Sequence, residues 1–127
     1  MSSFTDYTEN ALLNHLLRNV ALTSPAAVYL ALFTVAPTDA GGGTEVAGSG
    51  YARQAITFGA PSGGAVANTA AVSFTAAGGN FGTVLAVGIF DALTAGNMLA
   101  WDGIASAVIN DGDTINFPIG DIDVTLD

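Results

Sequence analysis

The hydrophobic residues near the start of the chain recur at helical spacing. One apolar stripe is formed by Leu12, Leu13, Leu16, Leu17 and Val20. Their spacing of three and four residues predicts an amphipathic helix from about Thr5 to Val20. Asp6 and Glu9 stand where carboxylates favour a helix N-terminus, and Arg18 stands near the other end. Ser24-Pro25 is expected to close the segment, because the residue before a proline avoids the helical region.

After Pro25 the pattern becomes one of strands and turns. Two runs, Ala26–Phe33 and Phe81–Phe90, are apolar on both faces, which is typical of central strands covered on both sides. Ala36–Gly50 is predicted to be a long glycine-rich loop, and Asn110–Asp113 a tight turn. Shorter strands are predicted at Tyr51–Phe58, Ala65–Asn68, Ala71–Phe74, Asn97–Trp101, Ile104–Ile109, Thr114–Phe117 and Ile122–Leu126.

Several short strands separated by Gly, Pro, Asn and Asp favour a sandwich or a partly closed barrel, and of these we expect the sandwich. The predicted fold class is therefore mostly β, a β-sandwich in jelly-roll style with one N-terminal α-helix. We expect a single domain over residues 1–127, with a helical segment at 1–24 and the sandwich at 25–127. Within Tyr51–Phe58, the period of two places Ile56 and Phe58 on one face and Arg53 on the other.

The composition indicates that part of the apolar surface is shared between subunits. Half of the residues are hydrophobic and only 10% are charged, about half the usual charged share. A chain of 127 residues cannot easily hide so much apolar area within itself. We therefore expect a homo-oligomer. The absence of cysteine excludes disulfides, thiolate metal sites and thiol nucleophiles.

The charge balance argues against two classes of partner. Two arginines, Arg18 and Arg53, face eleven acidic residues, for a formal net charge of −9. A nucleic-acid binder needs many cations to neutralise phosphates, and an anionic membrane surface needs them too. No apolar run reaches the roughly 18 residues of a membrane helix, and the N-terminus lacks the cationic start of a signal peptide. We expect neither nucleic acid nor membrane as a partner.

Candidate catalytic groups are few. His15 is the single histidine, and at the edge of the apolar stripe it is expected to be a helix-surface or interface residue rather than a catalytic base. Without lysine, Schiff-base chemistry and a phosphate-gripping P-loop lysine are excluded. Asp91 and Asp102 are a conceivable glycosidase pair, but both adjoin turn signals, where solvated aspartates are common. We predict that the protein is not an enzyme.

Two aspartate pairs raise the question of calcium. Asp111 with Asp113, and Asp121 with Asp123, supply the oxygens that this hard cation prefers. Asp-Gly-Asp matches only a fragment of a calcium-loop motif, and turn chemistry explains it equally well. We predict no cofactor and assign no metal site.

Several stretches carry a resemblance to a known family. The sequence resembles small virion proteins of tailed bacteriophages, often called tail fibre proteins, over nearly its whole length. The matching stretches are Phe4–His15, Val28–Phe33, Gly50–Pro61, which is the most specific, and Gly88–Asp91. These motifs are structural rather than chemical. Some proteins of this kind and size serve as cement on the capsid exterior.

The resemblance and the apolar excess together define the expected function. It is that of a capsid decoration protein, made in the host bacterial cytoplasm, that binds the major capsid protein on the outside of the virion and also binds its own copies. The alternative is a tail-fibre or receptor-binding component that recognises host surface glycan. An enzyme is a further alternative, which release of reducing sugar by the purified protein would support.

The predicted contact residues are aromatic, aliphatic and arginine side chains of the kind that dominate interfaces. They are Leu12, Leu16, Tyr29, Tyr51, Arg53, Phe58 and Trp101. For Arg53 two roles stay open, because its guanidinium fork can clasp a carboxylate on a neighbouring subunit or form a salt bridge within its own chain.

Overall fold

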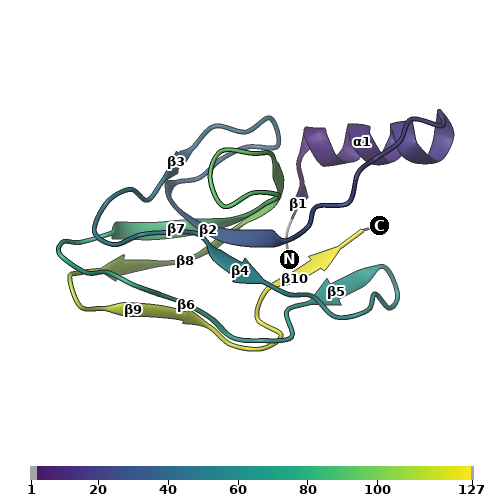
Figure 1. The fold of residues 1–127 in the computed structure, drawn as a ribbon. Helices are drawn as coiled ribbons and strands as arrows, with labels where there is room; N and C mark the ends of the chain where they lie inside the picture. Colours follow the sequence, from purple (N-terminus) through teal and green to yellow (C-terminus); the bar gives the residue numbers. More distant parts are fainter. Residues whose placement is uncertain (1–2, 127) are drawn as a thin grey trace.

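A six-stranded antiparallel sheet forms the larger layer of the molecule (Figure 1). The computed structural model describes residues 3–126. The strands follow the order β1-β8-β7-β2-β3, and β4 also pairs with β2. Their bounds are β1 Ser3–Phe4, β2 Val28–Val35, β3 Thr44–Glu45, β4 Gln54–Ile56, β7 Gly82–Phe90 and β8 Met98–Ile109.

The second layer consists of two strand pairs rather than one continuous sheet. β6 (Val72–Thr75) pairs with β9 (Thr114–Phe117), and β5 (Ala65–Ala67) pairs with β10 (Asp123–Thr125). Figure 1 shows both pairs on the same side of the larger sheet. The predicted mostly-β, sandwich-like class with one N-terminal helix is confirmed.

The core lies between the layers and follows the alternation of the strands. Leu30, Leu32 and Val84 are fully buried in it, and β6 and β9 contribute Phe74 and Phe117. A second, smaller cluster consists of Met98 and of Ala31, Phe33 and Ala86, which alternate along β2 with Leu30 and Leu32 and along β7 with Val87 and Ile89. A register shift between Val84 and Ala86 places Val84 in the first cluster. Because successive side chains of a strand point to opposite faces, burial of both sets means that both faces of the central strands are covered. The prediction of two such strands is confirmed.

The helix α1 spans Asp6–Leu17, within the predicted segment. Thr5 caps its N-terminus, as its side chain accepts a hydrogen bond from the Thr8 amide. The prediction that Ser24-Pro25 closes it is wrong: Asn19, with φ +57°, takes a left-handed backbone that ends the helix earlier. None of the residues of α1 is buried, and Figure 1 shows the helix at the edge of the molecule.

Two further strand predictions needed correction. Asn97–Trp101 and Ile104–Ile109 are parts of one strand, β8, because Asp102 and Gly103 pair with β7 and do not interrupt it. The strand predicted at Tyr51–Phe58 shortens to β4, Gln54–Ile56. The residues before β4 instead contact the loop Ala36–Gly50, as described below.

The long loop Ala36–Gly50 folds back on the sheet. Its residues Thr44–Glu45 form β3, antiparallel to β2. The return depends on Gly43, which has φ +74° and lies so close to β2 that an added Cβ would stand 2.6 Å from the Val35 carbonyl oxygen. No other residue type fits this position without moving the backbone.

Candidate functional site

A clamp built on Arg53 joins three segments of the chain. Its Nε and one terminal nitrogen each donate to a carboxylate oxygen of Glu45 at 2.9 Å, which makes a bidentate ion pair. The other terminal nitrogen donates to the carbonyl oxygens of Ala92, at 2.9 Å, and Ala95, at 2.8 Å. The guanidinium carbon also lies 3.7 Å from the centre of the Phe90 ring. Arg53 therefore ties β3 and the turn after β7 to the segment that precedes β4.

Tyr51 completes the clamp from the core side. Its hydroxyl donates to Glu45 at 2.6 Å and accepts the Leu32 amide at 3.1 Å. Its ring stacks on Phe74, with centroids 6.0 Å apart, and meets Phe81 edge-on at 5.8 Å. One side chain thus links the hydrophobic core to the ion pair.

The electrostatics of the clamp favour its ionised form. Burial by itself raises the pKa of Glu45, but the hydrogen bonds from Arg53 and Tyr51, with the charge of the guanidinium, outweigh it and leave the pKa below its ordinary value. The hydrogen bond to Glu45 raises the pKa of Arg53, against the opposing effect of burial. Burial and the bond to Glu45 raise the pKa of Tyr51 strongly. The clamp is therefore ionised at neutral pH, with the phenol protonated.

Of the two roles predicted for Arg53, the structure shows the internal one. The arginine side chain is 8% exposed and that of Glu45 is 25% exposed, so the guanidinium is largely sequestered within its own chain. Tyr51 is likewise engaged with the core and with Glu45. What the clamp does chemically is to fix two surface loops on a rigid sheet.

The helix and the residue shortly after it carry exposed aliphatic side chains. Leu13, Leu16, Leu17 and Val20 are 55%, 73%, 77% and 46% exposed, and we call these four residues the aliphatic patch. Leu13, Leu16 and Leu17 lie on one face of α1, because residues three and four apart are neighbours on a helix. Leu12, by contrast, is half-buried. Most of the predicted apolar stripe is thus left open.

The other predicted contact residues lie in different places. Tyr29 is half-buried on β2, and its neighbours in the ladder are Ala55 and Phe90. Phe58 is half-buried against the core. Trp101 packs on the smaller cluster and donates from its indole nitrogen to Asp39 at 2.9 Å, which holds the loop Ala36–Gly50 against β8. The structure therefore does not bring the seven predicted residues together into one surface.

A hollow of about 460 Å³ lies beside β8, on the side of the second layer. Its apolar wall includes Ile89, Ile104 and Ile115, and Asp102 and Asp121 also line it. Asp91 lines a separate groove near His15, and its carboxylate accepts from the amide and the side chain of Asn97. The two carboxylates that were considered as a glycosidase pair thus belong to different hollows.

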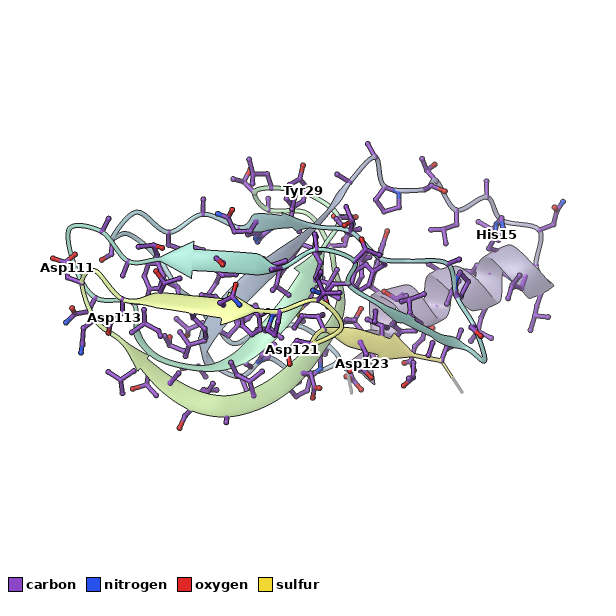
Figure 2. All side chains as sticks on the ribbon, turned by 90° about the horizontal axis from the view of Figure 1, so that it is seen from below. His15, Tyr29, Asp111, Asp113, Asp121 and Asp123 are labelled. Atoms are coloured by element: carbon purple, nitrogen blue, oxygen red, sulfur yellow. The ribbon has the colours of Figure 1, made fainter. Side chains whose placement is uncertain are left out.

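The remaining candidate groups serve turns or lie on the surface (Figure 2). Asp113 accepts the Asn110 amide and closes the predicted turn, whereas Asp111 accepts the Gly78 amide and holds this turn against the loop between β6 and β7. Figure 2 shows Asp121 and Asp123 well away from them, near β10, and His15 on the exposed helix. Within residues 3–126 no three acidic or histidine side chains gather closely enough to hold a metal ion.

Two buried polar residues have structural roles that were not predicted from the sequence. Asn68 is 2% exposed, and its amide donates to the carbonyls of Ala70 and Pro118 while its carbonyl accepts the Ile122 amide. Thr5 is 2% exposed and donates to the Met98 carbonyl at 2.6 Å. Nothing in the sequence near Asn68 indicated its role, but Thr5, three residues before Thr8 and directly before the helix, carried a capping signal.

The arrangement is that of a structural module. In the part of the chain described above, the polar contacts brace loops and turns, while aliphatic side chains stand open on the helix. Within this same part, no helix has the length and apolar character needed to cross a bilayer.

Comparison with known proteins identifies the family. A family model described as podophage GP4 fiber I protein gp80 matches residues 3–125. The chain belongs to this family, and it is a structural, fibre-type protein of the bacteriophage virion. The predicted resemblance to small phage virion proteins is confirmed. Among curated proteins no sequence match was found.

Proposed function

We propose that the chain is a multi-copy building block of a fibre-type appendage on the phage particle, and that it acts by binding rather than by catalysis. The description of its family supports the fibre assignment. The observation that carries the assembly role is the aliphatic patch. Four large aliphatic side chains are between 46% and 77% exposed beside a β body that already has its own core. Such surfaces are typical of contact sites between proteins.

The Arg53 clamp supports a scaffolding role. A subunit that carries load in a particle benefits from loops that keep their shape. Here the turn after β7 and the loop Ala36–Gly50 are both fastened to the sheet by charged or indole hydrogen bonds. Hydrogen bonds that involve an ionised group are stronger than neutral ones.

A second candidate, capsid decoration, is favoured by the architecture. Residues 3–126 fold into two short layers with no elongated shaft (Figure 1). In this alternative the protein docks on the capsid exterior, and the major capsid protein is its partner. Many weak contacts would then sum to a strong attachment through multivalency.

Copy number and position on the particle separate the two functions. Quantitative mass spectrometry of purified virions would count this chain against the major capsid protein, and antibody-gold labelling would locate it. A small fraction of the capsid-protein count with label on appendages supports the fibre function. A count comparable with that of the capsid protein, with label over the whole shell, would instead establish decoration. Absence from purified particles would rule out both.

If the chain belongs to a fibre, host surface glycan is the recognition target that we propose for it. Binding of purified protein to host surface polysaccharide, with and without release of reducing sugar, would test both recognition and the proposed lack of catalysis. Release of sugar above the level of a heat-denatured control would overturn the non-enzymatic proposal.

A further inference from the structure

The aliphatic patch is large enough to serve as a contact surface. From the exposed fractions of its four side chains, it presents roughly 400 Å² of apolar surface. This lies within the range of the largest patch on a typical monomer, which is often a functional surface. Burying two such patches against each other removes about 800 Å² from water, and the rim around them brings the total toward the roughly 1,000 Å² of a small specific interface.

We propose that the cover is the same patch on a second copy of this chain, with the two α1 helices packed antiparallel about a twofold axis. This inference deepens the proposed function by naming the partner, and it rests on that function only in expecting many copies on one particle. A symmetric contact uses one surface twice, so the single patch suffices to form it.

Charge selects a second copy as the occupant. The chain carries a net charge of −9, so two copies repel each other over most of their surface. From Asn10 to Val20 the sequence holds no acidic residue, and its one charged residue with His15 neutral is Arg18, which donates to the Asn14 side chain. The patch is therefore free of carboxylates, and two acidic chains can approach each other there. A strongly basic partner would gain more electrostatic binding energy on the surface that carries the carboxylates than on this patch.

Charge also selects the antiparallel direction. Asp6 and Glu9 occupy the first turn of α1. A parallel pair would bring these carboxylates together, whereas an antiparallel pair centred near Leu16 places the two Glu9 side chains roughly 20 Å apart and the two Asp6 side chains farther still. That separation exceeds the Debye length of about 8 Å at physiological ionic strength.

The position of the helix leaves room for this contact. Figure 1 shows α1 at the periphery with strands on one side only. Thr5 and Thr8 anchor its first turn to β8 through the carbonyl oxygens of Met98 and Leu99. The helix is thus held at its N-terminal end while the face of Leu13, Leu16 and Leu17 stays open.

The first test measures association of the purified full chain by sedimentation equilibrium over micromolar to near-millimolar concentrations. We expect a reversible rise from 12.7 kDa toward twice that mass. The double variant Leu16→Gln/Leu17→Gln keeps helix-forming residues and should weaken the dimer at least tenfold. The matched control is Ile119→Gln, which alters a side chain that is 69% exposed elsewhere, and it should change the dissociation constant by no more than about twofold. Circular dichroism confirms that each variant is folded.

The second test determines whether the two helices run parallel or antiparallel. It uses single cysteine substitutions, because the chain has no cysteine of its own. Leu16→Cys, near the twofold axis, should form a disulfide-linked dimer under mild oxidation. Glu9→Cys, in the first turn, should not, because its sulfur atoms would be roughly 20 Å apart in the antiparallel pair. Equal cross-linking of both variants would overturn the antiparallel arrangement.

The outcomes separate this inference from the proposed function. A chain that stays monomeric at the highest concentration, or a double variant that dimerises like the wild type, overturns the pairing. If such a chain is still found in virions, the proposed function stands and another virion protein covers the patch. A chain that dimerises through the patch but is missing from purified particles upholds the pairing and overturns the function.

Discussion

Replacing Arg53 with methionine tests whether the clamp stabilises the fold. The change keeps an unbranched side chain of similar length but removes both hydrogen bonds to Glu45, the two bonds to the turn after β7, and the contact with Phe90. Glu45 retains the Tyr51 hydroxyl as a donor. The carboxylate is then left largely sequestered without its counter-charge.

The magnitude follows from burial. Breaking a buried ion pair by removing one partner costs about 3–5 kcal/mol. Glu45 is 25% exposed, so water partly replaces the arginine and the cost falls to about 2–3 kcal/mol. This cost includes the loss of the cation–π contact with Phe90. For a small domain with a urea m-value of about 1.5 kcal/mol/M, the unfolding midpoint should fall by roughly 1.3–2 M.

Urea titration followed by the fluorescence of the single tryptophan measures the change. The control is Arg18→Met, which removes the other arginine. Arg18 is exposed and its guanidinium donates to the Asn14 side chain one turn earlier in the helix, so the free energy of unfolding should change by less than about 0.5 kcal/mol. A double-mutant cycle with Glu45→Gln should show a coupling of at least about 1.5 kcal/mol. Equal effects of Arg53→Met and Arg18→Met, or strict additivity in the cycle, would refute the reasoning.

Three further predictions concern pH, a buried amide and the helix cap. The pKa of Glu45 is lowered in the folded state, so the ionised carboxylate stabilises the fold above its ordinary pKa of 4.5, and this stabilisation is lost as the pH falls through the folded pKa. Thermal melts between about pH 5 and pH 2 should therefore show a smaller fall in melting temperature for Glu45→Gln than for the wild type. Asn68→Ala removes the acceptor of the buried Ile122 amide and the side-chain donor to the carbonyls of Ala70 and Pro118, of which Pro118 still accepts the Asp121 amide. It should cost about 2–4 kcal/mol by urea titration, and a wild-type midpoint would contradict this. Thr5→Ala removes the cap and the bond to Met98 and should cost about 1–2 kcal/mol. Hydrogen exchange should show the first turn of α1 opening more than the sheet, and uniform opening would argue against a local role.

The sequence determined the features that depend on local pattern. Apolar runs on both faces predicted β2 and β7 as central strands, and both are buried as expected. Asn110–Asp113 predicted a turn because asparagine, aspartate and glycine favour turn backbones, and the turn lies between β8 and β9. The stripe of leucines predicted α1 because a helix places residues three and four apart on one face.

The tertiary structure alone decided which groups meet. A stripe of leucines reads the same whether it is buried or open, so only the fold shows that Leu16 and Leu17 face outward. The partner of Arg53 could not be predicted, because Glu45 approaches it only when Gly43 lets the loop return against β2. Asn68 acquires its role from Pro118 and Ile122, about fifty residues away. The pattern of residues along the chain determines helices, strands and turns because these depend on neighbouring residues. Contacts between distant residues depend instead on how the two layers of the fold pack together.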